Sequence, residues 1–314
     1  FMNHCNFNIT NLNMKNTSHP FILHFAFFAI FILAFCQGLK AQQTICTTVP
    51  STNHCEYDPN WNNQNEPGPF YIRTFVHVVR DANGTGGQSE SQVQEALSYL
   101  DQAFNPHNIF FVPDCEIDYI DDHHFYILNG TPEIFTVNNH PNGIDIYLFP
   151  DFPFPVNIGG GKASDVCSKE FYVSGNFWLP PYTSIVRSYV ISHEMGHCLG
   201  LKHTFGSAQI VNDPNCNGGV SFTPLGDFIC DTPPDPNMDY DVNPATCQWG
   251  GSGNDQNGVP YNPDETNIMA YSHVDCQDSF SEGQGQLMRN IIANLQLLQD
   301  CLISTLADPS IPPN

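Results

Sequence analysis

Basic residues are scarce in this chain. Its 314 residues include nine Lys and Arg against 32 Asp and Glu, which gives a formal net charge of −23 at pH 7. Such a surface repels phosphate backbones and anionic lipid headgroups. The composition therefore argues against nucleic-acid binding and against membrane binding through a polybasic segment. The acidity is typical of a soluble, self-repelling surface, and some carboxylates are also candidates for hard cations such as calcium.

The N-terminal apolar stretch is short for a membrane span. The run FILHFAFFAIFILAF, at 21–35, has 15 residues, whereas a spanning helix needs about 20. It follows Lys15 and leads to Ala41, an order typical of a secretory signal. We therefore expect residues 1–41 to comprise upstream residues and a signal peptide, and the product to be secreted, without stable membrane insertion. An N-terminal membrane anchor is the alternative, and the oligomeric state is not indicated.

Several common motifs are missing. No two cysteines have CxxC spacing, which argues against a zinc ribbon or a thioredoxin motif. The glycine-rich VNIGGGKASD, at 156–165, has neither the P-loop ending nor GxGxxG spacing. This pattern predicts an edge strand or a bend with close backbone approach.

Ten of the twelve cysteines follow Ala41, and an even number in an exported chain favours disulfides. Cys198 is interpreted as a buried, hydrophobe-like thiol. Cys46 or Cys55 is a candidate inhibitory thiolate in a proform, and a local disulfide between those two is the alternative. Four cysteines of the irregular C-terminal half are disulfide candidates whose pairing the sequence leaves open: Cys216, Cys230, Cys247 and Cys276.

Hydrophobic patterns predict an α/β (α+β) fold. Strands are expected from alternating or continuous β-branched and aromatic runs at 70–81, 108–120 and 143–150. Helices are expected at 89–104, from near Thr183 or Ser184 to Gly200, and at 280–302, where Ser281 and Gln284 form a capping box. Residues 206–266 show no long periodic segment, which in a folded domain favours a functional region or one held by ligands and disulfides.

The stretch VISHEMGHCLGLKHTF, at 190–205, predicts a metal site. His193 and His197 are four residues apart, so on a helix both imidazoles project from one face. Gly200 suits a left-handed turn that ends the helix and returns His203 as a third ligand. Three imidazoles leave one position open for water, as in catalytic zinc sites. Glu194 is then placed beside the ion rather than bound to it.

The pattern HExxHxxGxxH followed by NIMAY resembles that of the metzincin peptidases. The resemblance implies that Met269 lies in a turn beneath the zinc and forms an apolar floor. It also implies that Tyr271 approaches the metal and donates a hydrogen bond to the tetrahedral oxyanion. Glu194 is expected to act as the general base.

Three segments narrow the resemblance: HEMGHCLGLKHTF, GDFICDTPPDP and NIMAYSHVDCQDSFSEGQGQLMRN. Together they resemble the pappalysin group of metzincins, especially its secreted cytophagalysin and ulilysin-like members, over roughly residues 70–300. The resemblance implies a metzincin-type catalytic domain, with a twisted mixed sheet and two main helices above a loop-rich C-terminal subdomain that ends in a helix. It also implies peptidase activity on proteins or peptides. A calcium site is implied at Asp227, Asp231 and Thr232.

Four regions are expected along the chain. Residues 1–41 are the upstream and signal region, and 42–68 a short pro-segment or linker. The catalytic domain is expected at 69–303, with subdomains that divide at about 203/204, and 304–314 as a disordered tail. The predicted function is a secreted zinc endopeptidase that uses metal-activated water. The alternatives are a secreted zinc-binding module with an inactive peptidase fold, a peptidase whose third ligand is a distant glutamate, and a calcium-held structural protein.

Overall fold

The computed structural model describes residues 46, 48, 66–128, 130–150, 160–175, 185–205, 210–216, 226–238 and 241–303. The proposed signal region and the C-terminal tail lie outside these ranges, as does Cys55. Among the residues described, no helix combines the length and the apolar character that a membrane span needs.

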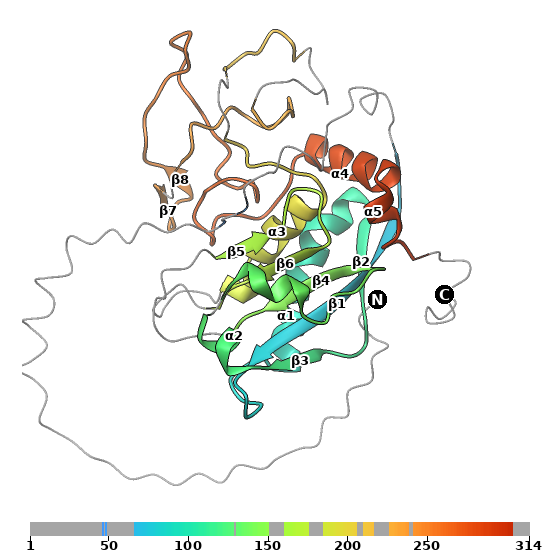
Figure 1. Ribbon diagram of the computed structural model, residues 1–314. Helices are drawn as coiled ribbons and strands as arrows, with labels where there is room; N and C mark the ends of the chain where they lie inside the picture. Colours follow the sequence, from blue (N-terminus) through green and yellow to red (C-terminus); the bar gives the residue numbers. More distant parts are fainter. Residues whose placement is uncertain are drawn as a thin grey trace, which may run out of the picture. The chain divides into compact units, whose positions relative to one another are not determined.

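A mixed sheet organises the N-terminal half of the described chain (Figure 1). Its order is β2-β1-β4-β6-β5, and β3 also pairs with β1. Only β5 is antiparallel to its neighbour. The strands are β1 (Phe70–Arg80), β2 (Ile109–Pro113), β3 (Asp118–Asp121), β4 (Ile144–Leu148), β5 (Gly161–Ala163) and β6 (Glu170–Val173). A mixed sheet and an α/β fold were both predicted, and both are confirmed.

The expected strand at 108–120 is two strands rather than one. β2 pairs with the first half of β1 and β3 with its second half, both in parallel register. Pro113 ends β2, and a proline has no N–H with which to continue a ladder. The sequence DCE at 114–116 then forms the turn between them.

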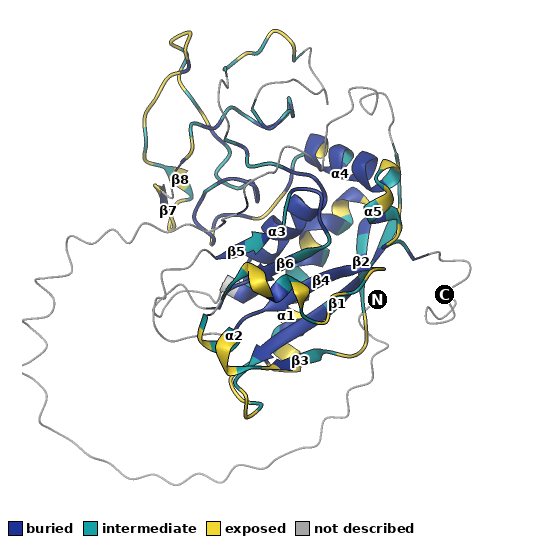
Figure 2. Ribbon diagram, in the orientation of Figure 1, coloured by how far each residue is buried: buried dark blue, intermediate teal, exposed yellow. Residues whose placement is uncertain are grey.

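The two faces of the sheet carry different layers. Side chains alternate across a strand, so Ile72, Val76 and Val78 of β1 join one core while Val79 joins another. The larger core lies against α1 (Glu90–Phe104) and α3 (Val190–Cys198). The opposite face is covered by α2 (His123–Leu128) and the 3-10 turn η3 (Pro132–Thr136). Figure 2 shows that β4 and α3 are buried along their length.

The helix that carries the histidines begins later than expected. A single 3-10 turn, η4 (Ile185–Arg187), precedes it, and the α-helix begins at Val190. The helix is buried on all sides, so its hydrophobic pattern did not mark where regular α-helical hydrogen bonding begins. Its end is as predicted: Gly200 has φ of +95° in the turn that follows.

The C-terminal half contains little regular structure before its last helix. A short hairpin is the only strand pair in the part of this half that the structure describes. Its strands, β7 (Val242–Asn243) and β8 (Gln248–Trp249), have two residues each. The final helix was predicted as one element but is interrupted at Leu295, which gives α4 (Glu282–Asn294) and α5 (Gln296–Gln299). The capping box of Ser281 and Gln284 at its start is confirmed. After α5 the chain pairs with β1, where Ile303 N donates to Tyr71 O.

Candidate metal centre

Helix α3 presents two imidazoles with fixed tautomers. The Nδ1 atom of His193 lies 2.6 Å from Ile268 O, and that of His197 lies 2.8 Å from Leu201 O. A carbonyl oxygen only accepts, so each Nδ1 carries the proton and each Nε2 keeps its lone pair. An outer hydrogen bond of this kind orients metal-binding histidines.

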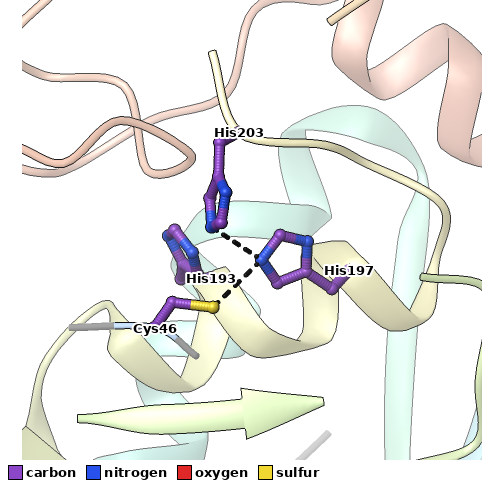
Figure 3. Close-up of side chains that lie close together, drawn as sticks. All are labelled: Cys46, His193, His197 and His203. Atoms are coloured by element: carbon purple, nitrogen blue, oxygen red, sulfur yellow. Dashed lines mark hydrogen bonds between the residues drawn. The ribbon is translucent and has the colours of Figure 1, made fainter. Parts of the chain in front are cut away.

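The turn at Gly200 brings the third histidine to the same place. His203 Nε2 lies 3.2 Å from His197 Nε2, and the three rings converge in Figure 3. The ring of Phe205 stacks on His203 at 4.9 Å with an interplanar angle of 7°. Gly200 is tightly enclosed, since a Cβ there would meet the side chain of Ile291.

The three rings fit a zinc ion. His193 Nε2 is buried and has no hydrogen-bond partner among the described residues, although an isolated polar atom of this kind is costly. Burial lowers the pKa of His193 to about 4 and that of His197 to about 3, and it places the pKa of His203 well below 6.5. Neutral imidazoles with free lone pairs are the form that binds metal.

Glu194 lies beside the three histidines and is fully buried. Its Oε2 accepts from Ala163 N at 2.8 Å, while Oε1 has no partner within the described part of the chain. Gly161 leaves room for this side chain, because a Cβ there would lie 2.6 Å from Glu194 Cγ. Burial raises the pKa of Glu194 to about 8. A bound cation would favour the ionised form.

Met269 lies in a turn that packs against α3, the helix of His193 and His197. Ala270 N donates to Asn267 O across this turn, and Asn267 Oδ1 accepts from Met269 N. The thioether is fully buried and would lie 2.8 Å from a Cβ at Gly196. A glycine in α3 therefore allows Met269 to pack directly against the helix.

Two residues from the N-terminal segment enter the site. Cys46 Sγ lies 3.3 Å from His197 Nε2, as drawn in Figure 3. The same sulfur lies 3.6 Å from Glu194 Oε2. Thr48 Oγ1 donates to the same carboxylate oxygen at 3.1 Å. Tyr271 donates its hydroxyl hydrogen bond to Cys46 O at 2.8 Å. Cys46 is a free thiol, so the expected alternative of a disulfide to Cys55 is wrong.

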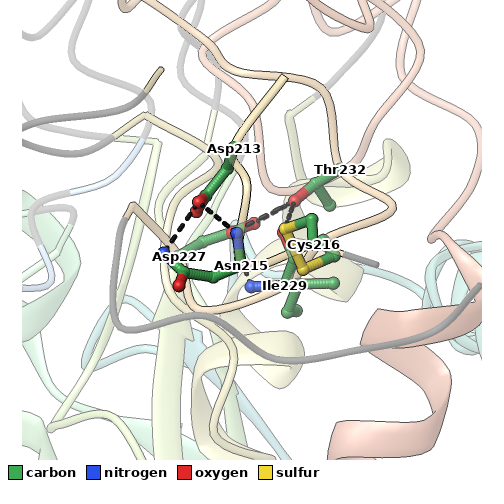
Figure 4. Close-up of a disulfide and its surroundings, with 7 residues drawn as sticks. Asp213, Asn215, Cys216, Asp227, Ile229 and Thr232 are labelled. Carbon is green, nitrogen blue, oxygen red and sulfur yellow. Dashed lines mark hydrogen bonds between the residues drawn. A yellow bond between two sulfur atoms is a disulfide. The ribbon is translucent and has the colours of Figure 1, made fainter. Parts of the chain in front are cut away.

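Two of the three residues expected to bind calcium contact each other, and the third has other hydrogen-bond partners. Asp227 is buried and accepts from Ile229 N and from Thr232 Oγ1 (Figure 4). Asp231 instead binds the start of α4, where it accepts from Ser281 Oγ and Gly283 N at 2.7 Å each. Calcium at these positions stays a prediction.

The four disulfide candidates are paired with one another. Cys216 bonds to Cys230, and Cys247 bonds to Cys276. Figure 4 shows the disulfide at Cys216. Cys198 is a free, fully buried thiol inside α3, as predicted.

Three contributors to the site were not singled out from the sequence. Gly161 gives space to Glu194, Thr48 binds that carboxylate, and Phe205 supports His203. The prediction of close backbone approach at 156–165 was the one signal for Gly161. Thr48 lies in a segment without a pattern, and Phe205 ends the quoted histidine stretch but has no assigned position in its HExxHxxGxxH pattern, so only their three-dimensional neighbours reveal these roles.

Comparison with known proteins agrees with this geometry. A family model described as pregnancy-associated plasma protein-A, of the M43 peptidases, matches residues 161–293. An extracellular metalloprotease of Colletotrichum graminicola is 25% identical over 242 residues, which cover 71% of this chain and 76% of the relative. Pappalysin-1 of Homo sapiens is 36% identical over 106 residues, which cover 31% of this chain and only 6% of that protein. The chain thus spans a small part of pappalysin-1.

A solved peptidase structure has a similar fold. Mirolysin in complex with compound 9 matches with a TM-score of 0.50 and 18% identity, over 74% of this chain and 96% of mirolysin. The fold, the three histidines and the family match define a zinc metalloendopeptidase of the metzincin class. Within that class, residues 161–293, which hold α3 and the turn at Met269, are similar to the pappalysin family, whose model they match.

Proposed function

We propose that this chain is a secreted endopeptidase in which His193, His197 and His203 hold the zinc and Glu194 is the general base. The observation that carries the proposal is a pair of buried atoms at the site, His193 Nε2 and Glu194 Oε1, which have no hydrogen-bond partner among the residues that the structure describes. Each atom has the chemistry of its assigned role, a lone pair for a metal and a carboxylate oxygen for a proton. When bound there, zinc would lower the pKa of a coordinated water to about 7 and would polarise the scissile carbonyl.

Glu194 is oriented for proton transfer by its other oxygen. The backbone N–H of Ala163 in β5 holds Oε2, which leaves Oε1 to take the proton of the attacking water. The same oxygen then returns a proton to the leaving amine, so the peptide C–N bond breaks with charge balanced. Backbone support of this kind fixes the carboxylate without ordering a second side chain.

Tyr271 is assigned to the oxyanion. Its hydroxyl already donates to a peptide carbonyl, that of Cys46, at the edge of the histidine cluster. The Tyr271 hydroxyl would donate a hydrogen bond in the same way to the carbonyl oxygen of a bound substrate as that oxygen becomes negatively charged.

We also propose that the protein is secreted and that its catalytic domain is one segment of the chain. The relatives from Colletotrichum graminicola and Coccidioides posadasii are named extracellular metalloproteases, and the apolar run at 21–35 has the form of a signal peptide. Disulfides are also typical of exported proteins. The catalytic domain is assigned to 69–303, with proteins or peptides as substrates.

The function is tested by casein hydrolysis with and without a zinc chelator, beside the Glu194→Gln variant. We expect the variant to bind zinc as the wild type does and to lose activity by at least about 10²-fold, the usual contribution of a general base. An active variant would overturn the assignment of Glu194. Zinc binding without any cleavage by the activated wild type would instead favour an inactive, zinc-binding module.

The free thiol at the site supports a latent proform. Cys46 is buried against His197, forms a parallel bridge with Gly161 of β5 and points its sulfur at the histidine cluster. A thiolate is a strong zinc ligand, so it would occupy the position that water needs. Thr48 covers Glu194 at the same time. The N-terminal segment therefore blocks both the metal and the base until it is removed.

Latency is tested with Cys46→Ser, which removes the sulfur but leaves the segment in place. We expect the full chain carrying this change to hydrolyse casein at least about tenfold faster than the uncleaved wild type, because serine binds zinc far more weakly than a thiolate does. Cys115→Ser is the matched control, since Cys115 is a free but exposed cysteine. Equal activity of the Cys46 variant and the uncleaved wild type would argue against the switch.

A further inference from the structure

A second group of metal-ligating side chains lies on the opposite face of the sheet from α3. Within the described residues, two sets of His, Cys or carboxylate atoms converge closely enough for one ion: the histidine cluster with Cys46, and His77 with His140 and Asp145. His77 is on β1 and Asp145 on β4, while His140 precedes β4. Because His77 and Val79 are two residues apart on one strand, both face the layer of α2 and η3.

The three side chains meet at one oxygen atom. His77 Nε2 lies 2.9 Å from Asp145 Oδ1, and His140 Nδ1 lies 2.7 Å from the same atom. The other oxygen, Oδ2, accepts from His140 N at 2.9 Å, which fixes the carboxylate. His77 and Asp145 are fully buried, so this convergence occurs away from bulk water.

The outer contacts are those of a metal-binding histidine. Asp118 Oδ2 lies 2.7 Å from His77 Nδ1 and accepts from Asn138 Nδ2 at 2.8 Å. When the Nδ1–H of His77 donates to Asp118, the lone pair of Nε2 points toward Oδ1 of Asp145. Either a proton or a metal ion then has to lie between these two atoms, and a metal there would complete a carboxylate–histidine–metal arrangement.

The rings are held in position by stacking. His140 lies on Phe75 with ring centroids 3.7 Å apart, and His77 lies on Tyr147 at 4.4 Å. Both pairs are nearly parallel, with interplanar angles of 12° and 16°. A preorganised ligand set costs little side-chain entropy when an ion binds.

The cluster is open on one side. The side chain of His140 is 36% exposed and that of Asp118 is 39% exposed, whereas their partners are buried. An ion could therefore enter past His140, and water could complete its coordination there.

We propose that His77, His140 and Asp145 form a second, structural site for a divalent transition metal such as zinc, with Asp118 orienting His77. Two nitrogens and one carboxylate oxygen are a ligand set that zinc accepts. Atoms bound to one tetrahedral zinc lie about 3.3 Å apart, given bonds of ~2.0–2.1 Å, so each of the two nitrogen–oxygen distances would lengthen by about half an ångström. The site joins β1, β4 and the turn before β4, independently of the catalytic cluster.

The test is the zinc content of the purified full chain after loading and gel filtration, measured by elemental mass spectrometry. We expect about two equivalents in the wild type and about one in each of His140→Ala, Asp145→Asn and the double variant Cys46→Ser with His203→Ala, because each of these proteins loses ligands from one site only. The triple variant of Cys46→Ser, His203→Ala and His140→Ala should bind close to none. Zinc should also raise the unfolding temperature of Cys46→Ser with His203→Ala but not that of the triple variant.

Two controls exclude other zinc-binding groups. His124→Ala changes an exposed histidine on α2, and Cys115→Ser removes the exposed thiol; both should keep two equivalents. One equivalent in the wild type would overturn the proposal, and the contacts of Asp145 would then be hydrogen bonds from protonated rings. Two equivalents in a folded His140→Ala protein would overturn it as well, since the second ion would lie elsewhere.

Discussion

Glycines shape this centre because they leave room for larger side chains, and the surroundings of Glu194 show how. Glu194 is packed between Gly161 of the edge strand and the three histidines, and Gly196 makes the equivalent space for Met269 on the same helix. In both places a methyl group would meet a side chain closer than 3.0 Å. These glycines therefore set positions that the charged and thioether groups could not reach otherwise.

At this scale we predict that Gly161→Ala lowers kcat by about 10²-fold without loss of zinc. The added Cβ would displace the carboxylate of Glu194, and a displacement near 1 Å can cost about 10²-fold in rate. Gly253→Ala is the control, because a Cβ there meets only the ring of Tyr261 at 3.5 Å. Steady-state kinetics of the activated enzyme and its zinc content give the comparison. Unchanged kcat in Gly161→Ala would show that Glu194 tolerates the shift.

Helix α4 packs on a short 3-10 turn, η2 (Asn105–His107), through another glycine. A Cβ at Gly285 would overlap the ring of His107, and Arg289 donates to His107 O at 3.0 Å. His107 is buried, and its Nδ1 has no hydrogen-bond partner in the described part of the chain. Burial lowers the pKa of His107 below its ordinary value of 6.5. The contact between η2 and α4 thus depends on a neutral imidazole.

At the scale of elements we predict that acid weakens this contact. Because the folded pKa of His107 lies below the unfolded pKa, the unfolded chain binds more protons as the pH falls through 6.5. The contribution is complete above that pH and is lost progressively below it. Urea unfolding of the zinc-loaded protein should show a shallower loss of stability, between about pH 7.5 and about pH 5.5, in His107→Gln than in the wild type. His124→Gln, at an exposed site, should match the wild type, and equal slopes in all three proteins would contradict the prediction.

The irregular half of the molecule is held by cross-links and a small core. Met238, Val242, Ala270 and Cys276 form a third hydrophobic cluster, against which Cys247 and Trp249 pack. The disulfide between Cys247 and Cys276 closes 29 residues and includes the turn at Met269. A region with so little regular structure has few other means to offset its chain entropy.

At the scale of the whole molecule we predict that Cys247→Ala with Cys276→Ala lowers the free energy of unfolding by about 3 to 4 kcal/mol, from the entropy of a loop of this length. The turn at Met269 should loosen, so the variant should also bind zinc more weakly. Cys115→Ala is the control at a free, exposed cysteine. Chemical unfolding and chelator competition measure both effects, and a loss of stability no larger than that of the control would rule out a structural role for this disulfide.

Much of the fold followed from local patterns. The strand at 70–80, the helix at 90–104 and the capping box at Ser281 were predicted because their periodicity or capping residues are local. The predicted start of α3 was wrong, because a helix that is buried on all sides shows no amphipathic pattern to mark where it begins. The break at Leu295 was missed because the apolar pattern continues into α5, although the backbone does not.

The sequence by itself determined the histidine spacing, the glycine after them and the methionine turn, because four-residue helical spacing and left-handed glycines act within one segment. Only the tertiary structure decided which cysteines pair, that Cys46 and Thr48 reach Glu194, and that His77 and His140 meet at Asp145. These contacts join residues far apart in the chain, as Cys46 and His197 are. Their pairing depends on the order of the strands in the sheet and on how loops pack over it, and no local pattern encodes either.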